Sequence, residues 1–592
     1  MHYLSPDYLI VYAFLLITLV IGLRSGRGIK DVREYATANK SFGTGTLVLT
    51  WLATDIAGET VLDMTGSVRT VGIIQPLTVF GGCGIAMLMQ ALVFAPQFIR
   101  FGHCMTMGDV MGQLYKKPAQ VMTGILGFFT ALCIAGMELT VLGLLCEHLL
   151  GIDFRFGVGI GGLLLVVYTA HGGIKSVAFT DLFQGLILFI VVPIIMVAVL
   201  KQVGGVQHVL IQVPPSQLQL FNHPKSSYYL ALFLSLSVFQ FSVIDPALMQ
   251  RILMGRTKQQ LRHQFFIVAT CLFALMLALS LLGLASIILY PANTDVPIVM
   301  HIVGNILPTG IKGLAVAGLL AITMATFDSF LHAAGLTLIH DVVNVWYSHM
   351  SRSFDELKWV RYATILIGFL VIGVGFSRAD ELYGFVLLSY KFTGPLLAFP
   401  LFAGVCGLKP DQRAFYVASG ATIMTLLLAE WLCPVSQDHW VPLVSVAVNG
   451  CFFLGTHAVR NRGFAVINTT QEQSYYLWRP HPESLWTRLQ HLLPTPEHIV
   501  AYSQRQVARY GSSHMLFAVF CCVNYLFPYF MWDHSTPQAY NLMLYLRLIG
   551  AMMCGLILAK DKWPESLLPY LPTYWHLTLL YCLPFTSTVM FL

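Results

Sequence analysis

Residues 50–66 read TWLATDIAGETVLDMTG. This segment is otherwise apolar, but Asp55, Glu59 and Asp63 place three carboxylates within two and a half helical turns. Each would cost about 2.5–3.5 kcal/mol at the centre of a membrane-spanning helix, so such groups face a protein interior or a water-filled cavity and usually mark a functional site. Gly58 lies among these polar residues and indicates that the helix is interrupted there. An interrupted helix frees backbone carbonyls that can bind a cation.

The composition of the whole chain indicates an integral membrane protein. Of its 592 residues, 56% are hydrophobic and only 10% are charged, whereas a soluble domain carries about 25% charged residues. Only helices and closed barrels satisfy their backbone groups in lipid. The apolar runs are about 20 residues long and do not alternate with polar residues, which is typical of membrane-spanning helices. The sequence therefore predicts an all-α protein with membrane lipid around it.

Apolar spans set the predicted organisation. Thirteen of them precede a polar stretch at 460–512, and three more follow it. The spans lie at about 7–24, 42–69, 73–99, 119–149, 156–171, 177–202, 226–254, 263–291, 311–346, 358–378, 383–407, 413–434, 440–459, 514–533, 540–559 and 570–592.

The loops between these spans predict the orientation. With the N-terminus outside, the inner loops up to residue 458 hold a threefold excess of Lys and Arg over the outer loops, as the positive-inside rule requires. This orientation places the 460–512 stretch in the cytoplasm, where its Trp and Leu residues are consistent with an amphipathic interfacial helix. The net charge of +6 is thereby explained by membrane orientation, and we expect no nucleic-acid partner.

A second motif occupies residues 168–184, which read YTAHGGIKSVAFTDLFQ. Gly172 and Gly173 predict a tight turn between two spans. Beyond the turn, Thr180, Asp181 and Gln184 lie on one helical face. Taken alone, Asp181 could be an acid in the first turns of a helix, where the helix dipole favours it.

This second motif closely resembles the pattern of the sodium:solute symporter family. In that family the aspartate supports sodium binding, a role that the resemblance assigns to Asp181. The 50–66 segment resembles the first core helix of proline/sodium symporters, and Ala53, Asp55 and Ile56 fall on matching positions. The resemblance implies that the carbonyls of Ala53 and Ile56 are sodium ligands.

The same segment departs from the family pattern at two positions. Ala57 replaces a serine, and Glu59 replaces a tryptophan. In sugar-transporting relatives the position of Glu59 falls beside substrate-binding residues. The resemblance therefore implies that Asp55, Ala57 and Glu59 face the solute.

A third motif lies at 321–329, AITMATFDS. It resembles a family helix whose hydroxyls and one carbonyl complete the sodium site, and hard cations prefer such oxygen ligands. The resemblance assigns the carbonyl of Ile322 and the hydroxyl of Thr326 to the ion. Ala325 stands where the family has a first hydroxyl, so one ligand is missing. Asp328 compensates for that loss, or the site is degenerate.

Two further residues complete the predicted solute site. Asp245, followed by Pro246, resembles the position of a substrate-binding residue in sugar-transporting relatives; the alternative is an aspartate at a helix end near the interface. Lys391 lies eight or nine residues into its span, in a segment that resembles the family's tenth core helix. Buried cations are normally paired, and the candidate partners are Glu59, Asp245 and Asp328.

The resemblance covers about residues 7–460 and implies a LeuT-like, inverted-repeat core of five plus five helices. We expect repeat one at about 42–202 and repeat two at about 226–407. The predicted domains are a transporter domain at 1–459, a cytoplasmic linker at 460–512, and three additional C-terminal transmembrane helices at 513–592.

These features predict sodium-coupled symport of a small polar solute across the cell (inner) membrane. The excess of pocket carboxylates favours an amino acid or amine, with Lys391 available for a carboxylate; a proton-linked cycle is the alternative. A different class of function is a transporter-like sensory input domain that feeds a signalling domain, such as a histidine kinase, beyond residue 592. An enzyme is not expected, because no nucleophile–histidine pair or metal cluster is evident on a shared face.

Overall fold

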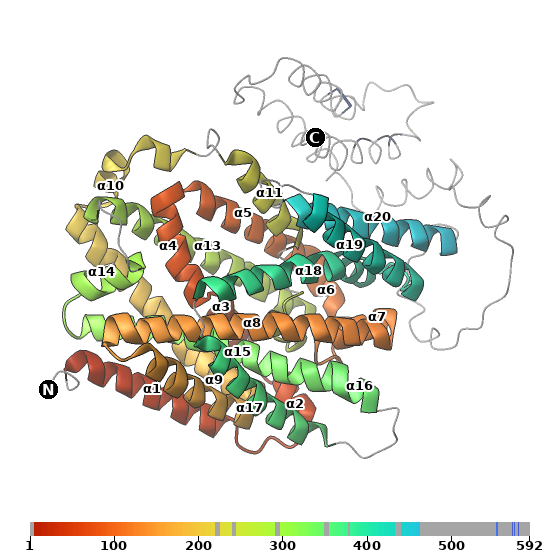
Figure 1. Ribbon diagram of the computed structural model, residues 1–592, viewed down its shortest axis with the longest axis horizontal. Coiled ribbons are helices and arrows are strands. Elements are labelled where there is room, and N and C mark those ends of the chain that lie inside the picture. The colour runs from red at the N-terminus through yellow and green to blue at the C-terminus, as the bar shows by residue number, and fades with distance from the viewer. Residues whose placement is uncertain are drawn as a thin grey trace. The chain divides into compact units, whose positions relative to one another are not determined.

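A computed structural model gives the arrangement of the chain (Figure 1). It describes residues 5–219, 225–239, 244–290, 297–347, 355–376, 379–432 and 440–461, together with residues 552, 553, 571, 574 and 578. The predicted linker and nearly all of the three predicted C-terminal spans lie outside the described residues. Those predictions therefore stay predictions.

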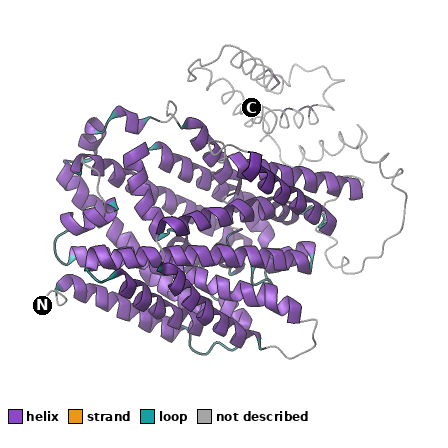
Figure 2. Cartoon of the chain, viewed as in Figure 1, coloured by secondary structure: helices purple, strands orange, loops and turns teal. Residues whose placement is uncertain are grey.

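The described residues form helices joined by short loops, and no strand occurs among them (Figure 2). Nine of the described helical segments are long and apolar enough to cross a membrane. The all-α membrane fold predicted from the composition is thus confirmed. The elements before the first repeat are α1 (Pro6–Ser25), α2 (Val32–Thr37) and the 3-10 helix η2 (Ala38–Lys40).

The first repeat starts with an interrupted helix. Its elements are α3 (Thr44–Asp55), α4 (Gly58–Val71), α5 (Ile74–Met89), the π-helix η3 (Gln90–Phe94), α6 (Ala95–Phe98), the 3-10 helix η4 (Ile99–Phe101), α7 (Met107–Tyr115), α8 (Lys117–Leu150) and α9 (Phe154–Val203). Two short elements, α10 (Val206–Gln212) and the 3-10 helix η5 (Pro215–Leu218), lead to the second repeat.

The second repeat has the same order of elements. It comprises α11 (Ser226–Phe239), α12 (Pro246–Leu253), α13 (Lys258–Leu289), α14 (Ile298–Ile306), α15 (Ile311–Thr337), the π-helix η7 (Leu338–Val343), α16 (Asn344–Tyr347), α17 (Glu356–Gly375) and α18 (Ala379–Val405). In both repeats an interrupted helix is followed by a long helix, a short helix and a second long helix. Two further helices follow, α19 (Gln412–Leu432) and α20 (Val441–Asn461).

The structure corrects the predicted span at 226–254, which consists of two helices. Asp245 has extended backbone angles and caps α12, and Pro246 occupies the first turn. Because proline lacks a backbone N–H and restricts the residue before it, the helix restarts at this point instead of continuing. The break corresponds in position to the one between α3 and α4.

The predicted turn at Gly172–Gly173 is confirmed by the geometry of α9. Gly173 has φ 50° and ψ −145° inside this 50-residue segment. In a straight helix Tyr168 and Thr180 would be about 18 Å apart along the axis, yet their hydroxyls lie 2.6 and 3.3 Å from the same oxygen of Asp328. The chain therefore turns sharply at Gly173, and α9 contains two spans.

The core of the bundle is built around α15. Almost the whole of this helix is buried, and its main neighbours are α8, α9, α1 and α17 (Figure 1). A helix that is apolar on every side lies either in the core of a protein or in lipid, and the burial of α15 places it in the core. Its few polar residues, among them Thr326, Asp328 and Ser329, are consequently held inside the protein.

Candidate functional site

The break between α3 and α4 is the geometrical centre of the site. Ile56 (φ −87°, ψ 88°) and Ala57 (φ −73°, ψ 148°) leave the helical conformation, and α4 begins at Gly58. The last carbonyls of α3 therefore have no donor four residues further along. This confirms the interruption predicted from the sequence.

A buried carboxylate on α8 holds the start of α4. The backbone N–H of Gly58 donates to Glu138 Oε2 at 3.0 Å, and Glu138 is fully buried. A Cβ at position 58 would collide with the methyl group of Thr323 on α15 and lie 2.9 Å from Glu138 Oε2. Only glycine lets the backbone approach these helices so closely. Glu138 was missed at the level of sequence, although an acid within an apolar span is itself a signal.

Two of the predicted sodium ligands meet at the end of α3. Thr326 Oγ1 lies 3.3 Å from the carbonyl oxygens of both Thr54 and Ile322. Ala53 and Ile56, in the last turn and at the cap of α3, are buried. The structure thus places the Thr326 hydroxyl of α15 beside the last turn of α3, while its contact with Ile322 lies within α15. Ala325 is fully buried and contributes no side-chain oxygen.

Asp181 forms a buried ion pair with Arg251 of α12. Arg251 Nη2 lies 3.2 Å from Asp181 Oδ2, and both side chains are fully buried. The same nitrogen donates to Thr54 Oγ1 at 2.9 Å and to Ser329 Oγ at 2.5 Å. Thr50 donates to the same oxygen of Asp181. A guanidinium therefore lies between α3, α9 and α15, the three helices that carry predicted sodium ligands.

This role of Arg251 was not predicted, because the sequence places it at a helix end where it counts as one of the inner-loop cations. The pair leaves one carboxylate oxygen available: Asp181 Oδ1 is buried and accepts no hydrogen bond within the described part of the chain.

Asp328 has its own partners on α9. Tyr168 donates to Asp328 Oδ2 at 2.6 Å, and Thr180 Oγ1 lies 3.3 Å from the same atom. Ser329 Oγ lies 3.5 Å from Oδ1. These contacts hold the carboxylate of Asp328 against α9. They do not test whether Asp328 compensates for the oxygen that Ala325 lacks, so that compensation stays a prediction.

The second break carries Asp245. Its Oδ1 accepts hydrogen bonds from the backbone N–H groups of Ala247 and Leu248 at 2.9 and 3.0 Å, and its Oδ2 accepts from Tyr390 at 3.3 Å. Asp245 is 6% exposed. It is therefore a helix cap, as the alternative expectation held, but a buried one at the break rather than a residue at the interface.

Tyr390 of α18 contacts one of the predicted acids. Its hydroxyl donates to Asp245 Oδ2 at 3.3 Å, whereas Asp55 and Glu59 lie at the first break, at the end of α3 and in the first turn of α4. Glu59 and Asp55 are half-buried. The predicted lysine on the same helix, Lys391, is half-buried and follows directly after Tyr390. The sequence drew attention to the lysine and missed the tyrosine.

Two other predicted residues complete the list. Ala57 is half-buried at the cap of α4, next to the break. Asp63, by contrast, is exposed one turn beyond Glu59, where Ser67 Oγ and Gln75 Nε2 lie 3.2 and 3.5 Å from its carboxylate oxygens. Asp63 therefore does not share the buried surroundings of Asp55 and Asp245.

Comparisons with known proteins agree with this geometry. The model of the family described as "Sodium:solute symporter family" matches residues 35–406. The chain is 22% identical over 454 residues to a sodium/proline symporter of Staphylococcus aureus, covering 73% of this chain and 87% of the relative. The protein from strain Newman is 23% identical over 455 residues, with the same coverage.

Solved structures share the fold at low sequence identity. A substrate-bound, outward-open Na⁺-coupled sialic acid symporter has a TM-score of 0.65 at 16% identity, covering 78% of this chain and 99% of that protein. Mhp1, a nucleobase-cation-symport-1 family transporter, has a TM-score of 0.52 at 14% identity, covering 74% and 97%. These neighbours confirm the LeuT-like inverted-repeat core. The matched residues, the two broken helices and the shared fold together establish that this chain is a transporter, not an enzyme, and belongs to the sodium:solute symporter family.

Proposed function

We propose that the protein imports an amino acid or amine together with sodium across the cell (inner) membrane, with its N-terminus outside. The observation that carries this proposal is the position of acids at the breaks of two helices: Asp55 and Glu59 lie at the first break, and Asp245, bonded to Tyr390, lies at the second. Transporters of this architecture bind their solutes at such breaks. An ammonium group is the solute chemistry that best matches several carboxylates at the breaks.

Charge is the physical reason for this preference. Like charges at low dielectric repel, so the acids must take up protons or bind a cation. One oxygen of Asp245 is already used by the backbone of α12, but its other oxygen faces Tyr390. A solute ammonium bound at the breaks would compensate the negative charge of these acids. Lys391, on the same helix as Tyr390, is our candidate for the carboxylate of a zwitterionic solute.

The sodium ion is proposed to bind at the broken end of α3. Its ligands would be the carbonyls of Ala53, Ile56 and Ile322 with the hydroxyl of Thr326. Support comes from Thr326, which reaches the carbonyl of neighbouring Thr54. Because the same break exposes the solute-facing residues Ala57 and Glu59, ion and solute would stabilise one conformation together. This shared element supplies the coupling.

A binding experiment with a matched control tests the solute. Thermal stability of the purified protein is measured with amino acids including L-proline, with amines and with neutral sugars, each with and without sodium. We expect stabilisation by zwitterionic or cationic compounds in sodium, and we expect Glu59→Gln to weaken it about tenfold or more, equivalent to about 1.4 kcal/mol.

The control is Asp63→Asn, which removes an exposed carboxylate one turn away on the same helix and is expected to change solute affinity by less than about twofold. Stabilisation by a neutral sugar, at an affinity that Glu59→Gln leaves unchanged, would contradict the proposal.

A further inference from the structure

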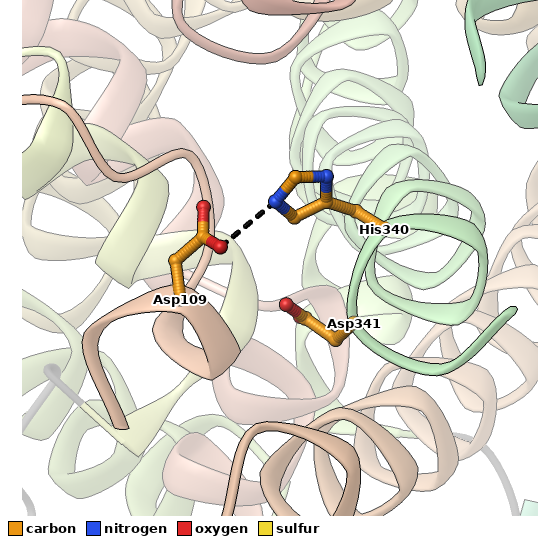
Figure 3. A group of neighbouring side chains, drawn as sticks. All are labelled: Asp109, His340 and Asp341. Carbon is orange, nitrogen blue, oxygen red and sulfur yellow. Dashed lines mark hydrogen bonds and ion pairs between the residues drawn. The ribbon is translucent and has the colours of Figure 1, made fainter. Parts of the chain in front are cut away.

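A second cluster of ionisable side chains lies away from the helix breaks. His340 and Asp341 belong to the π-helix η7, Asp109 belongs to α7, and Glu356 begins α17. One potential ligand atom from each of Asp109, His340 and Asp341 lies within 4.8 Å of the others. Figure 3 shows the imidazole and the two carboxylates directed toward a common space. The sequence did not predict this cluster, because Asp109 lies more than 200 positions before His340 and Asp341.

The imidazole of His340 is oriented by acids on both sides. Its Nε2 lies 2.9 Å from Asp109 Oδ1, and its Nδ1 lies 2.5 Å from Glu356 Oε1. Metal-binding histidines usually donate one ring N–H to a carboxylate, which orients the ring, and bind the metal through the other ring nitrogen. Glu356 thus fixes the ring in the orientation in which Nε2 faces Asp109.

One carboxylate oxygen of Asp341 is buried without a hydrogen-bond partner among the described residues, which is independent evidence for a bound ion or proton. Asp341 is fully buried, and its Oδ1 accepts hydrogen bonds from Thr106 at 2.7 Å and from Gln120 at 3.1 Å. Its Oδ2 is also buried but has no hydrogen-bond partner within the described residues. Buried polar atoms are nearly always satisfied, so an unpartnered carboxylate oxygen calls for a proton or a cation.

The surrounding residues hold the acids in place. Gln120 Nε2 lies 3.1 Å from the Oδ1 atoms of both Asp109 and Asp341. The carboxylate of Asp341 packs directly on Gly108, where a Cβ would collide with it.

We propose that Asp109, His340 and Asp341 bind one divalent first-row transition-metal ion, such as Zn²⁺. The ligands would be His340 Nε2 and one carboxylate oxygen from each aspartate, and Glu356 would act through the imidazole. One nitrogen with two carboxylates suits Zn²⁺ or Mn²⁺ better than alkali ions. The side chains of Asp109 and His340 are 21% and 12% exposed, which leaves an entry route and room for water ligands.

Binding would replace a proton by a metal ion. In the metal-free arrangement a proton lies between His340 Nε2 and Asp109 Oδ1, and it would be released to solvent as the metal binds. The ion would connect α7 to η7 and so link the short helix of the first repeat to the long central helix of the second. This proposal does not depend on the identity of the transported solute.

Calorimetric titration of the detergent-purified full chain, after treatment with EDTA, tests the site with Zn²⁺. We expect one saturable site whose affinity falls about 10–100-fold in Glu356→Gln and by more in His340→Gln. The control His263→Gln removes an exposed histidine of α13 and should leave the affinity unchanged. Thermal melting of each variant without metal shows whether it is folded.

Co²⁺ provides a second readout. Visible absorption bands should appear on addition of Co²⁺ to the wild type and should disappear in His340→Gln and Asp341→Asn. Absence of saturable binding of Zn²⁺ in the wild type would overturn the proposal. So would equal affinity in the wild type and His340→Gln, because the ion would then be bound elsewhere.

Discussion

Thr326 is the residue at which the proposed sodium site is most directly testable. Thr326→Val keeps the shape and removes the hydroxyl that lies 3.3 Å from two carbonyl oxygens. We expect sodium affinity to fall about tenfold or more, equivalent to about 1.4 kcal/mol, whereas Thr326→Ser should retain it. The measurement is sodium-dependent thermal stabilisation. Equal sodium affinity in Thr326→Val and the wild type would remove this hydroxyl from the site.

Ala325 gives the opposite test at the neighbouring position. Ala325→Ser would add an oxygen to a fully buried position of α15. If a missing ligand weakens the sodium site, the added hydroxyl should raise sodium affinity by several-fold, measured in the same assay. An unaltered affinity in a folded Ala325→Ser protein would show that this position does not limit sodium binding.

Substitution of Asp181 should affect both protein stability and sodium coupling, and a double variant separates the two effects. Removing one partner of a buried ion pair typically costs about 3–5 kcal/mol, because the other charge is left uncompensated. Asp181→Asn should therefore lower the melting temperature as well as weaken sodium-stimulated transport. The double variant Asp181→Asn/Arg251→Gln should recover part of the stability but not the sodium dependence. Full sodium dependence in either variant would exclude Asp181 from coupling.

Several site residues followed from the sequence, and others did not. Asp181, Thr326 and Ile322 occur in motifs that resemble those of the family, so the sequence could name them, and their role in sodium binding stays a prediction. Arg251 could not be named in this way, because nothing in its own segment shows that its guanidinium passes between three other helices. The cluster of Asp109 with His340 was also unpredictable for this reason. Contacts between helices distant in sequence depend on packing, which a local pattern does not contain.

At the scale of the element, the break in the first core helix requires glycine at its restart. A Cβ at position 58 would collide with the methyl group of Thr323 and crowd Glu138. Gly58→Ala should therefore destabilise the protein by about 1–3 kcal/mol, the usual cost of overpacking, and weaken sodium-dependent solute binding. Melting temperature and solute affinity are measured together.

Gly66→Ala is the matched control on the same helix, since a Cβ there has no atom within 4 Å. Alanine in a helix interior is favoured over glycine by about 0.5–1 kcal/mol, so this variant should be as stable as the wild type or more so. If Gly58→Ala and Gly66→Ala have the same melting temperature and solute affinity, the close approach of Gly58 to α8 and α15 is not required for solute binding.

The helix boundaries show which physical signals a sequence carries. Gly173 was predictable as a turn because two glycines interrupt an apolar run. The second break was harder to predict, since Pro246 alone is compatible with a kink as well as with a new helix. The cap formed by Asp245 decides between them, and its backbone contacts are a property of the folded chain.

At the scale of the whole molecule, the two repeats place their interrupted helices in corresponding positions, although the sequence shows no clear internal repeat. Repeats of this kind conserve the order and breaks of helices more than side chains, so the likeness emerges from the fold. The total of thirteen core spans and the outside N-terminus stay predictions. The sensory alternative depends on sequence beyond residue 592 and likewise stays untested.

Transport by the reconstituted protein tests the central claim most directly. Proteoliposomes loaded with potassium buffer are diluted into sodium buffer, and uptake is measured for labelled L-proline and for the amino acid or amine that stabilises the protein most. We predict that one of these solutes accumulates against its gradient only when sodium is outside, and that Glu59→Gln strongly reduces this accumulation at low solute concentration while Asp63→Asn preserves it. Accumulation that is equal in potassium and sodium buffer, or that Glu59→Gln leaves intact, would contradict sodium-coupled transport through the site at the helix breaks.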